Sequence, residues 1–324
     1  MALAVVHSPA EWVARFGASR AKTALTVGNF DGIHLGHQKI LRSVVERAQA
    51  TGTLATTVTF DPLPMKILRP AEAPPLISTL AQRLAGFEEL GLAAALVLRF
   101  DLELSRLTPE QFVCGILVEQ LRLASILVGE NFRFGYKQAG DVKLLDELGR
   151  RLGFAVEMVP PVVVRGEVVS STAIRRRVNE GCVERAARLL GRPFVLTGTI
   201  RPGTGRGRPV VFPTLNLATE QELLPAIGVY ATETQVAGRL HRSATNVGTR
   251  PTFDGSGLSV ESHLLDFSAT LTSGAMEVHF WKRLRDERKF SGPQALRAQI
   301  AADLARTRRF FEQLDRKRPT RQPA

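Results

Sequence analysis

The pattern of apolar residues changes once along this chain, near residue 192, and the two sides require different folds. From Thr23 to about Arg192, short β-rich runs alternate with segments of helical periodicity, which indicates a mostly parallel α/β sheet. After Pro193 the runs are short and separated by Gly and Pro, which is typical of a small antiparallel barrel. The length of 324 residues suffices for two domains with separate cores.

The α/β part contains five predicted strands with nearly continuous apolar residues, as expected where helices cover both faces of a sheet. These strands are Thr23–Gly28, Thr53–Phe60, Ala93–Phe100, Ala124–Gly129 and Phe154–Val159. A helix is predicted to begin at Thr108, an N-cap residue followed by proline. Two short helices after Ser170 are predicted to end at Gly181 and Gly191. We expect a Rossmann-like α/β domain over residues 1–192.

The second part predicts an antiparallel β-barrel of the six-stranded type. Its strands are predicted at Val195–Ile200, Val229–Val236, Leu240–Val247, Ser259–Leu265 and Met276–Phe280. An amphipathic helix from about Pro293 to Leu314 is expected to pack against the barrel. We therefore assign the barrel domain to residues 193–315 and a basic, frayed tail to residues 316–324.

The net charge of +12 raises the question of a nucleic-acid partner. Residues 306–324 hold seven Lys or Arg against two acids, so nearly half of the excess charge lies in the tail. The chain has only two Trp and two Tyr, which offers little aromatic surface for stacking bases. A basic surface that attracts anionic nucleotides is the favoured interpretation, and a basic RNA-binding protein is the alternative from another class.

The remaining composition predicts a cytoplasmic protein. Cys114 and Cys182 are the only cysteines and lie far apart in the sequence, which indicates neither a disulfide framework nor a zinc site. The N-terminus has no basic region followed by a long apolar run, and no stretch of 18 apolar residues occurs. We expect no membrane association.

Residues 28–37, which read GNFDGIHLGH, are built to approach a phosphate. They follow a predicted strand and open a helix, which is where open α/β sheets bind ligands. Glycines at positions 28, 32 and 36 permit close backbone approach, and the helix start offers unpaired N–H groups. His34 and His37, three apart, can donate hydrogen bonds to oxygens that gain charge as pyrophosphate leaves an α-phosphate. The alternatives are two exposed turn histidines or half of a metal site.

A second segment also has the composition of a phosphate loop. Residues 203–208 read GTGRGR, but no Gly-Lys-Ser/Thr follows, so they are not a Walker A loop, and a flexible basic turn is the alternative. Residues 212–216 read FPTLN, and the proline favours an extended chain in which Thr214 and Asn216 point the same way. Their hydroxyl and amide oxygens are hard ligands suited to Mg²⁺ held mainly by nucleotide phosphates.

The first segment resembles the G-x-F-D-G-x-H-x-G-H motif of α/β-phosphodiesterase nucleotidyltransferases. Residues 59–62 (TFDP), 129–135 (GENFRFG) and 170–175 (SSTAIR) narrow the resemblance to the adenylyltransferase module of bacterial bifunctional riboflavin kinase/FAD synthetases. It implies catalytic roles for His34, His37 and Arg175. It implies that nucleotide is bound by Gly28, Phe30, Asp31, Gly32, Gly36, Asn131, Ser170, Ser171 and Thr172. Core packing by Phe132 and Phe134, and helix capping by the serines, are the alternatives.

The second part resembles the riboflavin kinase module of the same family in residues 213–216, 228–231, 246–253 and 260–267. The resemblance implies that Glu261 accepts the proton of the ribityl hydroxyl and that Thr214 and Asn216 hold the metal. It implies that Gly203, Gly205, Arg206 and Gly207 bind nucleotide and that Arg250, Phe253, Arg288 and Phe290 bind flavin. A solvent-facing strand glutamate and a basic rim are the alternatives for Glu261 and for the residues around Arg288.

Two positions depart from the family pattern. Leu63 stands where the family usually has His after Phe-Asp-Pro, and residues 271–274 (LTSG) replace the usual Leu-Tyr-Gly. The first change bears on the efficiency of adenylyl transfer, and the second on flavin stacking or loop packing.

The resemblance covers nearly the whole chain and implies two successive reactions. ATP phosphorylates riboflavin to FMN at the barrel, and a second ATP adenylylates FMN to FAD at the α/β domain with release of pyrophosphate. Flavins are then substrate and product, and Mg²⁺ enters with ATP. The alternative within enzymes is a riboflavin kinase whose adenylyltransferase module is impaired.

Overall fold

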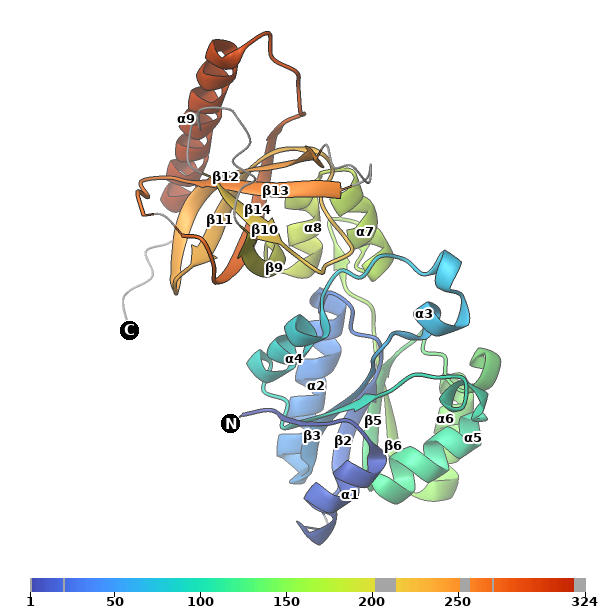
Figure 1. Ribbon diagram of the computed structural model, residues 1–324. Coiled ribbons are helices and arrows are strands. Elements are labelled where there is room, and N and C mark those ends of the chain that lie inside the picture. The colour runs from blue at the N-terminus through green and yellow to red at the C-terminus, as the bar shows by residue number, and fades with distance from the viewer. Residues whose placement is uncertain (1, 20, 202–213, 251–256, 270, 318–324) are drawn as a thin grey trace. The chain divides into compact units, whose positions relative to one another are not determined.

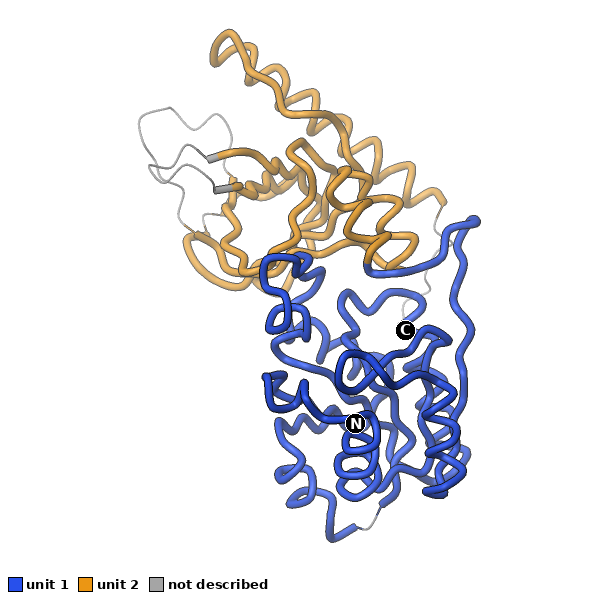
Figure 2. The backbone as a smooth tube through the Cα atoms, turned by 90° about the vertical axis from the view of Figure 1, so that its right-hand side faces the viewer, with its two compact units in different colours: residues 1–171 blue, residues 172–324 orange. Residues whose placement is uncertain are grey.

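The chain divides into two compact units, residues 1–171 and 172–324 (Figure 2). The computed structural model describes residues 2–19, 21–201, 214–250, 257–269 and 271–317. The two short helices predicted after Ser170 are present as α7 (Ser171–Asn179) and α8 (Val183–Leu190), and α8 ends at Gly191 in a left-handed conformation. Thr172 onward is grouped with the barrel. The functional boundary predicted near residue 192 stays a prediction.

The first unit is built on a six-stranded sheet in the order β1-β4-β3-β2-β5-β6, with every pair parallel (Figure 1). The strands are β1 (Ala4–Val6), β2 (Thr23–Val27), β3 (Leu54–Phe60), β4 (Ala94–Leu98), β5 (Leu123–Gly129) and β6 (Ala155–Val159). A small antiparallel pair, β7 (Val163–Val164) and β8 (Glu167–Val168), follows the sheet. The predicted α/β class is confirmed, and β1 is an additional edge strand.

Helices cover both faces of this sheet. They are α1 (Pro9–Phe16), α2 (Leu35–Thr51), α3 (Pro64–Leu68), α4 (Leu80–Glu89), α5 (Pro109–Gln111) with its π-helical continuation η4 (Phe112–Gln120), and α6 (Val142–Leu152). Short 3-10 turns lie at η1 (Gly17–Ser19), η2 (Pro70–Glu72), η3 (Leu104–Arg106) and η5 (Tyr136–Gln138). The start predicted at Thr108 is confirmed, because its hydroxyl accepts from the Gln111 N–H in a capping box.

Two hydrophobic clusters show why the predicted strands have nearly continuous apolar residues. Leu25 packs with Trp12, Val113 and Leu145 on the face covered by α1, η4 and α6. Its neighbour Ala24 belongs to the cluster of Leu41, Val44 and Phe87 on the face covered by α2 and α4. Successive side chains of β2 therefore enter opposite cores. Figure 1 shows α2 and α4 on one side of the sheet and α5 and α6 on the other.

The second unit is a closed antiparallel barrel in the order β10-β13-β12-β11-β14-β9. Its strands are β9 (Phe194–Arg201), β10 (Leu215–Ala218), β11 (Gly228–Val236), β12 (Arg239–Arg250), β13 (Gly257–Leu264) and β14 (Ala275–Arg285). The final helix, α9 (Pro293–Lys317), packs against β11, β12 and β14. The predicted barrel with a C-terminal helix is confirmed.

The barrel interior combines an apolar part with a chain of buried hydroxyls. Phe194, Leu196 and Phe280 are fully buried. The hydroxyls of Thr234, Ser243, Thr232, Thr245 and Ser262 form a continuous hydrogen-bonded chain, with oxygen to oxygen distances of 2.7, 2.8, 2.6 and 2.7 Å in that order. Because a hydroxyl can both donate and accept, each of these buried polar groups has a hydrogen-bond partner.

Candidate active sites

The turn after β2 lies at the carboxyl edge of the parallel sheet and leads directly into α2. Phe30 and Ile33 have backbone φ angles of 49° and 38°, and Gly32 has a φ of 86°. A Cβ atom on Gly32 would also lie 2.9 Å from Ile77 Cγ2. Gly32 is therefore required both by its left-handed backbone and by the close approach of Ile77.

The two histidines of the predicted motif stack on each other at the start of α2. Their ring centroids lie 3.6 Å apart with an interplanar angle of 17°. His34 is the N-cap residue, and its Nδ1 accepts a hydrogen bond from the His37 backbone N–H at 3.2 Å. A neutral His34 consequently carries its proton on Nε2. Gly36 is needed here because a Cβ would lie 3.2 Å from the His34 ring.

His37 lies beneath the surface of this turn. Burial lowers the pKa of its imidazole well below the ordinary value of 6.5, and the neighbouring His34 lowers the pKa further. Its Nδ1 is buried and has no hydrogen-bond partner within the described residues. At neutral pH the side chain is therefore an uncharged imidazole. The motif offers hydrogen bonds and helix N–H groups to an anion, without a fixed positive charge on His37.

Asp31 shapes the turn from inside the protein. Its carboxylate accepts hydrogen bonds from the Ile77 N–H at 3.0 Å, the Ser78 N–H at 3.0 Å and the Ser78 hydroxyl at 3.1 Å. The Ser78 hydroxyl in turn accepts from the Gly32 N–H at 2.8 Å. With only 2% of its surface exposed, the Asp31 side chain joins the turn to the segment before α4. The Ser171 hydroxyl donates to the Asp31 carbonyl at 3.1 Å.

Arg83, on α4, joins the ends of two adjacent strands, and the sequence analysis did not identify it. Its Nη1 donates to the Asn29 carbonyl at 3.2 Å, the Thr59 hydroxyl at 2.9 Å and the Phe60 carbonyl at 3.0 Å. Its Nη2 lies 3.4 Å from an Asp61 carboxylate oxygen. Burial lowers the pKa of this guanidinium, and the carboxylates of Asp61 and Asp31 oppose that effect. The only signal in the sequence is one arginine among apolar residues between the predicted strands Thr53–Phe60 and Ala93–Phe100.

The other predicted residues of this site differ in their surroundings. Asn131 is exposed after β5, whereas Phe134 is buried in the core and stacks on Phe132 with centroids 5.3 Å apart. The alternative of core packing therefore holds for these phenylalanines. Leu63 is only 7% exposed and begins α3 without a side-chain cap. Arg175 lies in the second turn of α7, in the other unit.

The predicted kinase residues form a row across the outside of the barrel. Asn216 on β10 is directly opposite Glu261 on β13. Glu261 is in turn opposite Asn246 on β12. On β13 the neighbours Val260 and Ser262 are buried, whereas Glu261 is partly exposed, so alternation places Glu261 on the outer face of the barrel. Asn216, opposite it, is only 8% exposed. Directly opposed side chains have Cβ atoms about 4.5–5.5 Å apart, and Asn216 and Glu261 thus share one small area.

The row continues in both directions around the barrel. Asn246 is opposite Val229 on β11, and Val229 is opposite Arg285 at the end of β14. On the other side, Asn216 is opposite Arg201 at the end of β9. Thr214 is exposed and directly precedes β10. The backbone of Arg250 ends β12, and Gly203, Gly205, Arg206, Gly207 and Phe253 lie outside the described residues.

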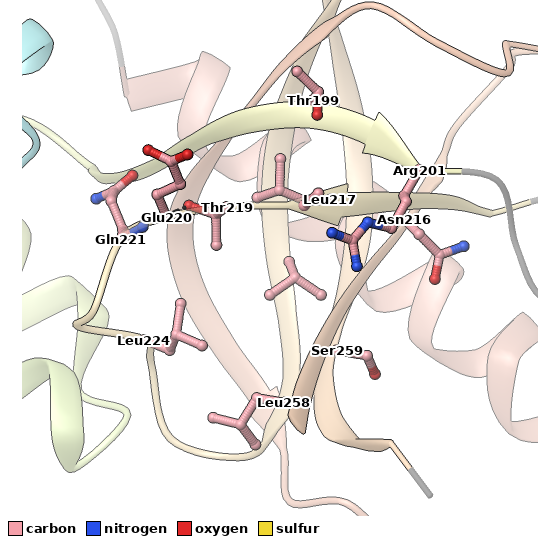
Figure 3. Close-up of a pocket in the computed structure, with 12 residues that line it drawn as sticks. Thr199, Arg201, Asn216, Leu217, Thr219, Glu220, Gln221, Leu224, Leu258 and Ser259 are labelled. Carbon is pink, nitrogen blue, oxygen red and sulfur yellow. Dashed lines mark hydrogen bonds between the residues drawn. The ribbon is translucent and has the colours of Figure 1, made fainter. Parts of the chain in front are cut away.

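A pocket of about 340 Å³ adjoins this row between β9, β10 and the start of β13. Figure 3 shows Arg201 and Asn216 at one end of it and Glu220 and Gln221 at the other. Gln221 is held in place, since its Oε1 accepts from the Thr197 N–H at 2.7 Å and its Nε2 donates to the Val195 carbonyl at 3.1 Å. The pocket has the size of a small-ligand site and a largely polar lining.

Two family models match this chain, one over each of its two parts. Residues 17–173 match the family model described as FAD synthetase, and residues 190–311 match that described as riboflavin kinase. The bifunctional riboflavin kinase/FMN adenylyltransferase of Escherichia coli (strain K12) is 34% identical over 288 residues, which cover 89% of this chain and 92% of that protein. The chain belongs to the bifunctional riboflavin kinase/FMN adenylyltransferase family.

Further relatives extend over similar lengths. The bifunctional riboflavin kinase/FMN adenylyltransferase of Pseudomonas fluorescens is 37% identical, over 87% of this chain and 91% of that protein. A solved structure from Streptococcus pneumoniae, described as a macrolide-efflux protein, is 27% identical with a TM-score of 0.83 and covers 95% of this chain and 99% of its own. Among the residues that the structure describes, no helix is long and apolar enough to cross a membrane. The family predicted from the sequence is confirmed.

Proposed function

We propose that the two units divide two ATP-dependent reactions between them and that the residues above carry those reactions. The chain is a riboflavin kinase and an FMN adenylyltransferase, as its family and both matching family models indicate. In the second unit ATP phosphorylates riboflavin to FMN. In the first unit a second ATP transfers its adenylyl group to FMN, which gives FAD and pyrophosphate.

The observation that carries the kinase assignment is the direct register between Asn216 and Glu261. A carboxylate beside an amide oxygen can accept the proton of the ribityl 5′-hydroxyl, whose oxygen then attacks the γ-phosphorus of ATP and displaces ADP. No group of three His, Cys, Asp or Glu within the described residues is arranged to hold a metal alone. The hard oxygens of Asn216 and Thr214 fit Mg²⁺ that takes its other ligands from nucleotide phosphates. When bound, Mg²⁺ supplies charge neutralisation on those phosphates.

The adenylyl site works through donors that are fixed before the nucleotide arrives. The start of α2 presents backbone N–H groups to phosphate, and the glycines of the turn before it allow the nucleotide to approach the backbone closely. The Nε2–H of His34 is a further donor, and His37 stacks against that ring. These donors stabilise the charge that grows on the α-phosphate oxygens and on pyrophosphate as the FMN phosphate attacks. Contributions from Asn131, Ser170, Ser171, Thr172 and Arg175 rest on the motif.

The two sites can be tested separately in one chain. We expect His34→Ala combined with His37→Ala to lower FAD formation by at least about 100-fold, because the charge-stabilising donor is lost, while FMN accumulates. We expect Glu261→Ala or Asn216→Ala to lower FMN formation by about 100-fold or more, while supplied FMN is still converted to FAD. Chromatography of riboflavin, FMN and FAD measures both. Loss of both activities in either variant would refute two independent sites.

The location follows from the substrates. Riboflavin, FMN, FAD and ATP are small molecules, and both cysteines are free thiols. We place the protein in the cytoplasm, where ATP is supplied and thiols stay reduced.

A further inference from the structure

Arg83 holds one peptide group of the turn after β2 from inside the protein. Its Nη1 donates to the Asn29 carbonyl at 3.2 Å, and the Thr59 hydroxyl donates to the same oxygen at 3.4 Å. Two donors on one carbonyl oxygen fix the direction in which the carbonyl points. The Arg83 side chain is 1% exposed, whereas Asn29 is exposed. The Asn29 carbonyl therefore points into the protein, toward α4.

The other side of that peptide group is the Phe30 N–H. The bond between Asn29 and Phe30 is trans, and in a trans peptide the C=O and the N–H point in opposite directions. The Phe30 N–H thus points away from Arg83. Within the part of the chain that the structure describes, it has no hydrogen-bond partner, although Phe30 is only 2% exposed. Because buried backbone N–H groups are nearly always paired, this one is a donor for a ligand at the carboxyl edge of the sheet.

The backbone of Phe30 is held in a conformation that bulky residues rarely adopt. Its φ of 49° lies in the left-handed region, and such strain persists only where the surroundings determine it. The Phe30 ring meets the ring of Phe87 edge-on, with centroids 5.6 Å apart. Arg83 and Phe87 are four residues apart on α4 and lie on one face of that helix. One helix face therefore fixes Phe30 at both its peptide group and its ring.

We propose that Arg83 is a positioning residue for adenylyl transfer. It holds the Asn29 carbonyl, and the Phe30 N–H of the same peptide is thereby aimed at a phosphate oxygen of ATP. The guanidinium charge also strengthens this donor, because linked hydrogen-bonding groups polarise one another. Donors aimed in advance at the charge of the transition state contribute most to the rate. The inference rests on the proposed function of the first unit and adds to it a residue outside every motif that identifies the adenylyl site.

The first test uses the full chain with Arg83→Met, which keeps an unbranched side chain and removes the donors. We expect the kcat of FAD formation to fall about 100-fold, as when one prearranged donor to the transition state is lost. The KM for ATP should change less than about threefold, and the kcat of FMN formation less than about twofold. Arg150→Met is the matched control, because Arg150 pairs with Asp146 on the surface of α6 and should leave both activities unchanged.

Arg83→Lys separates positioning from a purely structural role. Burial lowers the pKa of a lysine more readily than that of an arginine. As the pH rises from about 7 to about 9.5, the lysine becomes neutral and holds the Asn29 carbonyl less tightly, so FAD formation relative to wild type should fall at least about threefold. Stability relative to wild type should rise over the same range, because the unfolded lysine keeps its proton up to a pKa of about 10.4. Activity and stability then change in opposite directions.

Two results would overturn the inference. One is an unchanged kcat of FAD formation in a folded Arg83→Met variant. The other is an Arg83→Lys variant whose FAD formation rises with pH as its stability does, or does not depend on pH. If Arg83→Met does not fold, the pH profile of Arg83→Lys decides. A wild-type chain that forms FMN and no FAD would instead overturn the proposed function of the first unit.

Discussion

The two active sites are held in place by different kinds of interaction. In the first unit, a turn with three residues at positive φ is fixed by buried side chains, chiefly Asp31 and Arg83. These contact Ser78 and the ends of β2 and β3, far away in the sequence. In the second unit, Asn216 and Glu261 are neighbours because their strands pair. One site depends on particular side chains beneath it, and the other depends on backbone hydrogen bonds that any residue can form.

This difference predicts where each unit is sensitive to substitution. Residues buried beneath the turn should be essential for adenylyl transfer, since a strained turn persists only when its surroundings determine it. In the barrel, changes beneath the row should lower stability and leave the kinase chemistry in place.

The largest expected effect comes from Asp31→Ala. It removes the acceptor for the Ile77 N–H and the Ser78 N–H, two buried donors, and should lower the free energy of unfolding of the first unit by roughly 3 kcal/mol. FAD formation should fall about 100-fold as the turn loses its geometry. FMN formation should stay within about twofold, because the barrel does not depend on this contact.

The control for Asp31→Ala is Asp146→Ala in the same unit. Asp146 pairs with Arg150 one helical turn away on the exposed side of α6, and such pairs contribute less than about 1 kcal/mol. The chain has two tryptophans, Trp12 in the first unit and Trp281 in the second, so unfolding can be followed by fluorescence with Trp281→Phe as background. Equal stability of both variants would contradict the role given to Asp31.

An intermediate effect is expected from Thr245→Val inside the barrel. Its hydroxyl contacts those of Thr232 at 2.6 Å and Ser262 at 2.7 Å. Loss of these buried contacts should lower the stability of the second unit by about 1–2 kcal/mol. The kcat for FMN formation should nevertheless change less than about twofold, because strand pairing fixes Glu261. Thr234→Val, at the end of the chain of hydroxyls, should lower the stability of the second unit by a smaller amount. The stability of both variants can be measured by Trp281 fluorescence in a Trp12→Phe background.

A tenfold fall in kcat with Thr245→Val would contradict the expectation that changes inside the barrel leave the kinase chemistry in place. It would show that the interior of the barrel sets the position of the row on its outside. The Asn216 and Glu261 side chains would then need the same kind of support from below that Asp31 and Arg83 give to the first site.

The strands and motifs were predictable because they depend on local sequence. The predicted β-rich runs are strands in the structure, because alternating or continuous apolar residues indicate directly which side chains of a strand are buried. β1 and β10 were not predicted as strands, because three or four residues carry too little pattern. The domain boundary predicted at residue 192 stays a prediction, although the structure groups α7 and α8 with the barrel. Their apolar stripes report that one face is buried, and they carry no information about which surface covers it.

The supporting residues of the first site were hidden for another reason. Arg83 is a charged residue on a helix, and such residues are ordinarily exposed. Its partners include carbonyl groups at the ends of distant strands. Asp31 was identified from its motif, but the motif does not contain its partners at Ile77 and Ser78. Only the folded chain brings these groups together.

The smallest expected effect is a pH dependence confined to the first unit. The pKa of His37 lies well below 6.5 in the folded chain, through burial first and His34 second, whereas the unfolded chain titrates near 6.5. Above that pH both states are neutral and His37 adds no pH dependence. Below it only the unfolded state takes up the proton, so the stability of the first unit should fall with pH, by at most about 1.4 kcal/mol per pH unit. The barrel lacks this contribution.

Comparing wild type with His37→Gln isolates the effect of the stacked histidine pair, because groups away from that pair titrate equally in both. Between pH 6.5 and 5.5, the Trp12 signal should show a smaller loss of stability in the variant, and the Trp281 signal should show no difference. Saturating ATP should reduce the loss in the wild type, since an anionic phosphate at the start of α2 favours the protonated imidazole. Identical pH profiles with and without His37 would show that His37 is not buried as a neutral imidazole.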